Sequence, residues 1–234
     1  MRTSRAVAPG TLVFGRDDPD GDDHGPGNFA YPTSSNFKAG AYDLQRFEVY
    51  DAGDRIIFRV RTRDLTPTFG SPLGAQLVDV YVHIPGASPT STASAFGSRN
   101  YTLAPWAKRI EVQGFGQQYV DAAGATLGQV TITGNDVSRY ITFSVTKASL
   151  GTPASGWGFT VVLHGQDGFS SDQARGFQPT PQDFQFGVCA TAGSDPHCTV
   201  DPSTVPKAMD VIGGAAQLDY TQHQPVSISP VVVP

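Results

Sequence analysis

Apolar and polar residues alternate along four stretches of the chain, and this period of two predicts β-strands. The four stretches are residues 55–61, 76–84, 140–145 and 159–164. In the first, Ile56, Phe58 and Val60 would face one side of a sheet, and the arginines between them would face the other. Shorter apolar runs predict further strands at 11–14, 47–50, 109–112 and 130–133.

These short strands, with no long stretch of helical period, predict an all-β fold: a single antiparallel β-sandwich with long loops. The 26 glycines and 18 prolines recur between the apolar runs and indicate many turns. Only residues 147–150 and 171–175 have a locally helical pattern. The long connections are residues 16–36, 85–101 and 165–184, and long loops often carry function.

The economical interpretation is one domain over residues 1–234, with its core at about 11–221. The tail, residues 222–234, would add an edge strand or begin a linker. A formal charge of −5 gives no electrostatic reason to expect nucleic acid or an anionic membrane as a partner. No apolar run approaches the roughly 20 residues that span a bilayer, and no apolar core of a signal peptide follows the first five residues.

The two cysteines, Cys189 and Cys198, close a short polar loop, and the chain has no others. This arrangement predicts a disulfide and an oxidising compartment, outside the cell or at its surface. The alternative is a pair of free thiols in a cytosolic protein. A zinc site would need more ligands than the neighbouring His197 supplies.

Five aspartates fall within residues 17–23, in the sequence Asp-Asp-Pro-Asp-Gly-Asp-Asp. Like charges this close repel one another unless a counterion lies between them, and a hard divalent cation held by oxygen ligands is the simplest remedy. Because all the available ligands are oxygens, the ion expected is Ca²⁺. The proposed ligands in this run are Asp18, Asp20, Asp22 and Asp23. The alternative is a solvated acidic loop without a metal.

Binding of a carbohydrate would require an exposed aromatic plane flanked by polar side chains. Trp106 follows a proline in a loop and is the better tryptophan for stacking, whereas Trp157 leads into a strong strand and suits the core. Tyr101 is a third candidate. Phe115, Tyr119 and Phe169 also lie in loops or at strand ends.

Catalytic motifs are missing from the sequence. It contains neither the Gly-x-Ser-x-Gly nucleophile motif nor a His-Glu-x-x-His zinc motif. A glycosidase would need two carboxylates across a sugar-sized cleft, and no pair stands out. We therefore expect a chain that is not an enzyme.

Several long motifs together resemble the C-terminal domain of bacterial glucodextranases. The first reads Asp-Pro-Asp-Gly-Asp-Asp-His-Gly-Pro-Gly-Asn-Phe-Ala-Tyr-Pro-Thr at residues 18–33. The others are at 40–44, 66–82, 109–116, 157–168 and 187–210. The likeness covers most of the chain, residues 12–211, and its long motifs are specific.

That family is similar to family 9 carbohydrate-binding modules and DOMON-like domains, which are jelly-roll-like β-sandwiches, often calcium-bearing, on secreted glycan-active or surface-layer proteins. The resemblance implies a non-catalytic accessory module that binds polysaccharide, most readily an α-glucan, beside a tethered catalytic domain. It also places Asp43 as a remote metal ligand, the alternative being a turn-capping aspartate. The competing function is a structural or cell-surface attachment module without a sugar pocket.

Overall fold

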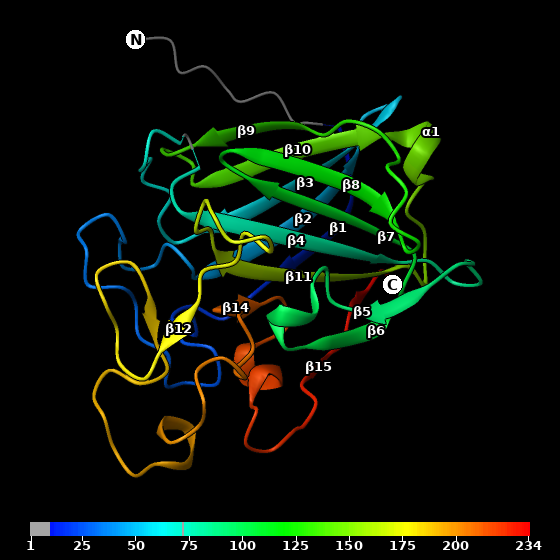
Figure 1. Cartoon of the computed structure of the whole chain (residues 1–234). Helices are drawn as coiled ribbons and strands as arrows, with labels where there is room; N and C mark the ends of the chain where they lie inside the picture. Colours follow the sequence, from blue (N-terminus) through cyan, green and yellow to red (C-terminus); the bar gives the residue numbers. More distant parts are fainter. Residues whose placement is uncertain (1–9, 72) are drawn as a thin grey trace, which may run out of the picture.

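The computed structural model describes residues 10–71 and 73–234, so the beginning of the chain, inspected above for a signal peptide, lies outside the described residues. Two antiparallel sheets dominate the fold (Figure 1). The first has the order β1-β2-β3-β10-β9. Its strands are β1 (Thr11–Asp17), β2 (Leu44–Asp51), β3 (Arg55–Thr62), β9 (Thr131–Asn135) and β10 (Tyr140–Thr146).

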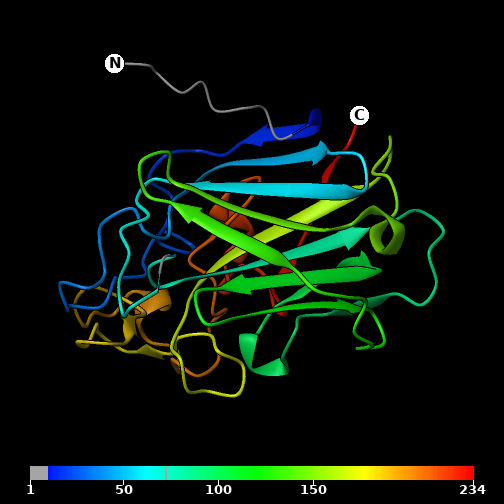
Figure 2. The same ribbon diagram turned by 90° about the horizontal axis from the view of Figure 1, so that it is seen from above.

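The second sheet has the order β14-β11-β4-β7-β8, and β16 also pairs with β11. Its strands are β4 (Gln76–His83), β7 (Lys108–Gln113), β8 (Gly116–Asp121), β11 (Gly158–Gly165), β14 (Asp210–Val211) and β16 (Val231–Val232). Viewed from above, the two sheets lie one behind the other (Figure 2). The expected all-β sandwich is confirmed, and each of the eight stretches predicted as strands overlaps a strand of these sheets.

Shorter elements complete the fold. They are β5 (Ser91–Ala93), β6 (Thr102–Trp106), β12 (Phe177–Gln178), β13 (Phe186–Gly187), β15 (Ser227–Ile228), α1 (Lys147–Leu150) and the 3₁₀ turns η1 (Gly97–Arg99), η2 (Pro196–Cys198) and η3 (Ala215–Leu218). Unlike the main sheets, the pairs β12–β13 and β15–β6 are parallel. The helical prediction for 171–175 was wrong, because Gln173 has a left-handed backbone (φ 55°) that a helix does not accept.

The core lies between the two sheets. Phe47 and Phe58 of the first sheet pack against Phe159 of the second, with ring centroids 5.4 and 6.2 Å from it. Phe143 stacks on Phe58 at 5.4 Å. Burying such aromatic side chains is the main force that holds the sandwich together. No helix among the described residues is long and apolar enough to span a membrane.

The two sheets differ on their outer faces. In β3 buried residues alternate with partly exposed ones, so the first sheet meets solvent on one side. In β4 and β11 every residue is buried, because the 85–107 segment and the C-terminal third cover the second sheet. Arg99, Asp79, Arg109 and Glu111 meet under this cover, and we call these four side chains the ion network.

The long loops after β1 and after β11 gather at one end of the sandwich (Figure 1). The backbone of Ala30 pairs with that of Gly187 in both directions, at 2.9 Å, so the loop after β1 lies against the segment after β11. The predicted disulfide between Cys189 and Cys198 is present in that segment. Residues far apart in the sequence are therefore brought together at this end.

Candidate functional site

Three aspartates meet where the loop after β1 crosses the start of β14. Asp18, Asp22 and Asp210 each offer a carboxylate oxygen, and these oxygens lie within 4.8 Å of one another. We call these three residues the acidic group. Asp18 and Asp22 come from the predicted acidic run, and Asp210 reaches it from the opposite end of the chain.

Backbone N–H groups orient the three carboxylates. Asp18 accepts a hydrogen bond from the N–H of Gly213 at 2.7 Å, and Asp22 accepts one from Ala215 at 3.3 Å. The two oxygens of Asp210 accept from Leu44 at 2.8 Å and Val211 at 2.7 Å.

The acidic group still has unsatisfied oxygens. Oδ2 of Asp18 and Oδ1 of Asp22 are buried without a hydrogen-bond partner. Within the described residues, no lysine, arginine or histidine forms an ion pair with any of the three carboxylates. A buried anion without a partner is unfavourable, so this arrangement suits a cation.

The pKa values of the acidic group show the same imbalance. Burial raises the pKa of Asp18 to about 7, and the charges of Asp22 and Asp43 contribute to this rise. Hydrogen bonds from backbone N–H groups act in the opposite direction. Burial also raises the pKa of Asp22. The pKa of Asp210 is raised well above its usual value, first by burial and then by the charges of Asp18 and Asp22. A bound cation would relieve all three effects.

Asp43 lies beside the acidic group but outside its tightest contacts. Its side chain is fully buried, and one oxygen accepts from the N–H of Gly21 at 3.0 Å and faces Arg63 at 3.4 Å. The other oxygen, Oδ1, is buried without a partner. Burial raises the pKa of Asp43 to about 6. Asp43 therefore fits a metal site, although Arg63 offsets part of its charge.

The remaining aspartates of the expected ligand set point to other partners. Asp20 accepts a hydrogen bond from the side-chain amide of Gln45 at 2.7 Å. Asp23 accepts one from the hydroxyl of Tyr31 and lies 3.4 Å from His24. Neither Asp20 nor Asp23 joins the acidic group, whose third member is Asp210.

The three aromatic residues proposed for sugar stacking are not on an open surface. Trp106 is only 5% exposed, and its indole N–H donates to the carbonyl of Ala93 at 2.8 Å. Tyr101 is buried, with its hydroxyl 3.2 Å from His164. Trp157 is partly buried and packs against the core. The expectation of an exposed stacking plane at Trp106 was wrong, because β5 and β6 fold its ring onto the second sheet.

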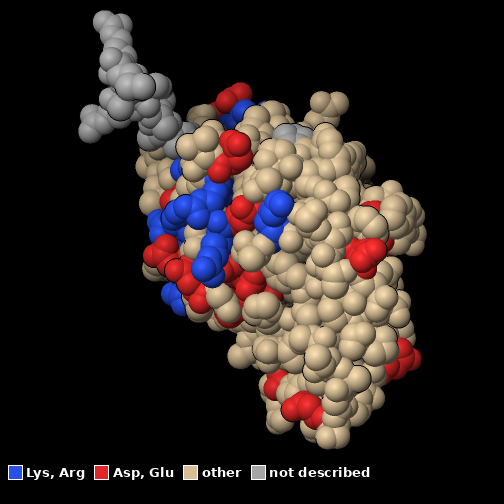
Figure 3. Space-filling model, turned by 90° about the vertical axis from the view of Figure 1, so that its left-hand side faces the viewer, with Lys and Arg blue, Asp and Glu red and all other residues tan. Residues whose placement is uncertain are grey.

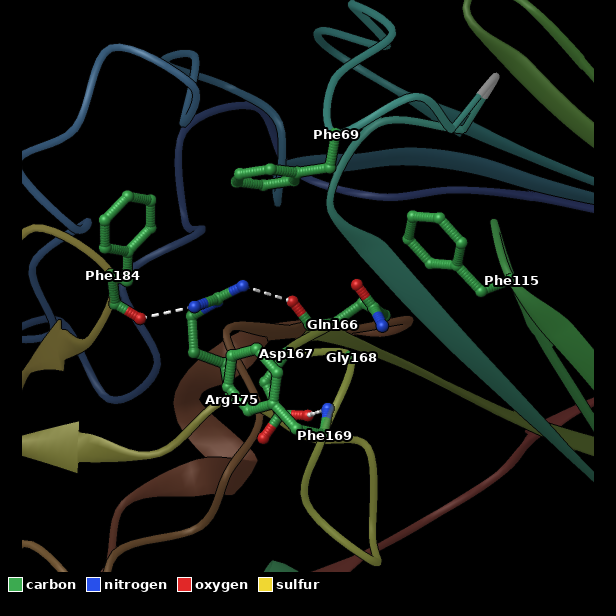
Figure 4. A pocket seen from close by; sticks show the side chains of 8 residues that line it. All are labelled: Phe69, Phe115, Gln166, Asp167, Gly168, Phe169, Arg175 and Phe184. Atoms are coloured by element: carbon green, nitrogen blue, oxygen red, sulfur yellow. Dashed lines mark hydrogen bonds between the residues drawn. The ribbon is translucent and has the colours of Figure 1, made fainter.

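The exposed aromatic rings are phenylalanines. In the described residues, every large exposed aromatic side chain lines one pocket of about 450 Å³ (Figure 4). These are Phe69 (40% exposed), Phe115 (58%), Phe169 (83%) and Phe184 (49%). Exposed apolar side chains gathered in one hollow are typical of binding sites and not of a folding core. We call this hollow the phenylalanine pocket.

Several local structures hold the rings in place. Phe69 has a left-handed backbone (φ 54°), an unfavourable conformation for a bulky residue that is found where function constrains a loop. Phe115 is next to Gly114, where a Cβ atom would lie 1.6 Å from the hydroxyl of Ser71. Only glycine allows the loop of Phe69 to approach the β7–β8 turn this closely. The carboxylate of Asp167 accepts from the N–H of Phe169 at 3.0 Å.

Polar groups lie between these rings (Figure 4). Arg175 donates to the backbone carbonyls of Phe184 and Gln166, and its guanidinium lies over the ring of Phe37 at 4.7 Å. Nε of Arg175 and the amide nitrogen of Gln166 are buried without a hydrogen-bond partner. Asp167 adds a carboxylate at the edge. The pocket therefore combines apolar faces with donors and an acceptor.

Comparison with protein families matches residues 13–228 to the C-terminal binding module, SLH-like, of glucodextranase. The chain belongs to this family. The glucodextranase module is a binding module and not a catalytic domain, so the expectation of a non-catalytic chain is confirmed. A search of curated proteins found no match.

Asp210 and most of the phenylalanine pocket were not identified from the sequence as parts of a site. Asp210 stands alone in Lys-Ala-Met-Asp-Val, with no acidic neighbour to draw attention. Phe69 and Phe184 are single aromatics in irregular loops, and the period-two pattern does not reach them. Phe115 and Phe169 were noted as loop or strand-end aromatics but had no stated partners. The signal that these four phenylalanines share is a direct Gly or Asp neighbour in the sequence.

Proposed function

We propose that this chain is a carbohydrate-binding accessory module that holds a neutral glycan, an α-glucan first of all, in the phenylalanine pocket. The observation that carries the proposal is the convergence of Phe69, Phe115, Phe169 and Phe184 on one open hollow. Family membership supports a binding role but does not name the ligand.

The chemistry of a sugar matches the pocket. Pyranose rings have C–H faces that pack on aromatic planes and hydroxyl groups that need hydrogen-bond partners. Here Arg175 and Gln166 supply donors, and Asp167 supplies an acceptor. The pocket lies in the range of about 300–1,000 Å³ typical of small-ligand sites. Binding would raise the local concentration of the polymer at a tethered catalytic domain.

We further propose that Ca²⁺ occupies the acidic group and stabilises the loop end of the module. Asp18, Asp22 and Asp210 would be the main ligands, with Asp43 beside them. Hard oxygen ligands favour Ca²⁺, since Mg²⁺ retains more of its water. The ion would join the loop after β1 to β14. An extracellular or cell-surface location is part of the same proposal, supported by the disulfide.

The test is isothermal titration of the calcium-loaded protein with isomalto- and malto-oligosaccharides. The wild type should give heats with a Kd between about 1 mM and 1 µM, the range of a shallow site. Phe169→Ala should weaken binding about tenfold, as expected for loss of an aromatic contact. Its melting temperature should not change, because Phe169 is 83% exposed.

The matched control is Val137→Ala, since Val137 is 87% exposed on a turn outside the pocket. That variant should bind like the wild type. Absence of heat with every glucan tested would favour the attachment role, and equal loss of affinity in both variants would place the glycan elsewhere.

A further inference from the structure

The outer face of the first sheet concentrates positive charge. The outward side chains of β2, β3 and β10 include four arginines, and we call this surface the arginine face. The four are Arg46, Arg55, Arg59 and Arg61. The acidic side chains among them are Glu48 and Asp17. Four positive and two negative charges give +2 here, against −5 for the whole chain. Figure 3 shows basic side chains gathered on one side of the molecule with acidic ones among them.

The strand register places like charges opposite each other. Arg46 of β2 pairs with Arg61 of β3, and Tyr140 of β10 pairs with Arg61 on its other side. Like charges directly opposite on neighbouring strands destabilise a sheet. Asp17 and Glu48 both bind Arg46. Nothing comparable offsets Arg61.

Arg61 is the unsatisfied member of this surface. Among the described residues it forms no ion pair, and its Nε is buried without a hydrogen-bond partner. Arg59, by contrast, binds Glu48 at 3.1 Å and stacks on the ring of Tyr140 at 3.7 Å. Stacking holds the guanidinium of Arg59 flat and ready to bind. The face therefore has one fixed and one unpaired guanidinium.

The spacing of these charges suits an extended polymer. Arg59 and Arg61 are two residues apart on one strand, about 7 Å, and Arg46 lies one strand away, about 5 Å. This surface is the outer face of a sheet, whose strands run side by side. Guanidinium groups bind carboxylates with two parallel hydrogen bonds. An extended chain bearing one carboxylate on each sugar presents its charges at comparable intervals.

We propose that the arginine face binds a carboxylated polysaccharide, with Arg61 making the principal contact. Nucleic acid is the less suitable polyanion, because duplex DNA carries one charge per about 1.7 Å, much closer than the spacing of these arginines. This surface shares no residue with the phenylalanine pocket. The two sites are therefore separable by mutation.

The experiment is affinity measurement on polygalacturonate at low ionic strength. Its fully methyl-esterified form is the control polymer, since it has the same backbone without charge. The wild type should bind the free acid, should not bind the ester, and should weaken as salt is added. The Arg61→Gln variant should bind polygalacturonate about tenfold more weakly, because it loses one group that makes charge-assisted hydrogen bonds.

Lys38→Gln is the matched variant, because Lys38 is exposed in the loop before β2 and lies off the sheet. It should bind like the wild type. Lack of binding to the acid, equal binding to the ester, or an Arg61→Gln protein with unchanged affinity would overturn the proposal. Equally tight binding of single-stranded DNA would show a general polyanion surface instead and would also overturn it.

Discussion

Two clusters of carboxylates differ in their surroundings, because the ion network buries positive charge beside its carboxylates and the acidic group does not. In the ion network, Arg99 reaches Glu111 at 2.8 Å and Arg109 reaches Asp79 at 3.2 Å, with Arg99 also paired to Asp79. In the acidic group, backbone N–H groups are the hydrogen-bond donors, and two oxygens remain without partners. Carboxylate side chains thus lie in opposite electrostatic surroundings in the two clusters.

The pKa values express this difference. Although burial acts to raise it, the charges of Arg99 and Arg109 and the contact with His164 hold the pKa of Asp79 below its usual range. Burial and mutual repulsion raise the pKa of Asp18 to about 7. A charge cluster that is complete in itself serves the fold, whereas one that lacks its counter-charge indicates a partner from outside the chain. Four predictions test that distinction.

The largest effect should come from breaking the complete cluster. Arg99→Met would leave Asp79 and Glu111 buried without their fully buried partner, and such losses cost about 3–5 kcal/mol. The melting temperature should fall by roughly 10 °C. Thermal unfolding followed by circular dichroism measures it. Arg16→Met, at an exposed position of β1, should change stability by less than about 0.5 kcal/mol. An Arg99→Met protein as stable as the wild type would mean that the network contributes nothing net.

The next effect should come from completing the incomplete cluster. Adding Ca²⁺ to chelator-treated protein at a hundredfold excess over Kd should stabilise it by about 2.7 kcal/mol. Calorimetry should show a rise in melting temperature of roughly 5–10 °C. Mg²⁺ at the same concentration should give a smaller rise. An unchanged melting temperature, with no metal found by elemental analysis, would reduce the acidic group to an ordinary acidic loop.

A smaller change should follow from removing one charge of the acidic group. Asp210→Asn keeps the shape of the side chain but relieves its repulsion with Asp18 and Asp22. The amide nitrogen of Asn cannot accept one of the hydrogen bonds that Leu44 and Val211 donate, and this loss offsets the relief of repulsion. Without Ca²⁺ the variant should therefore be close to the wild type in stability, and with Ca²⁺ it should lose most of the calcium-induced shift. Asp201→Asn, at an exposed position, should keep the full shift. If both variants respond to Ca²⁺ alike, Asp210 is not a ligand.

How far the sequence predicts each region depends on how local its signal is. The alternation around Phe58 predicted the strand and its buried face, because period two follows directly from strand geometry. The run containing Asp18 and Asp22 predicted an acidic site for a similarly local reason. Asp210 was not predictable, since only the packing of β14 brings it there. Trp106 was misplaced because its burial depends on a segment folding back over the second sheet.

The smallest effect is a pH dependence of stability at another carboxylate that has its own counter-charge, Asp172. Asp172 binds Lys207 at 2.8 Å, and Lys207 and two serine hydroxyls lower its pKa to about 2, although burial acts to raise it. Because the pKa is lower in the folded protein than its usual 3.8, the ionised carboxylate stabilises the fold above about pH 4. This contribution, about 1 kcal/mol after allowance for solvent screening, should disappear as the pH falls through about 2. In chemical denaturation between pH 5 and pH 2, Asp172→Asn should be less stable than the wild type at pH 5 and approach it in acid. A stability difference that stays constant over this range would show that the Asp172–Lys207 pair does not stabilise the fold through its charge.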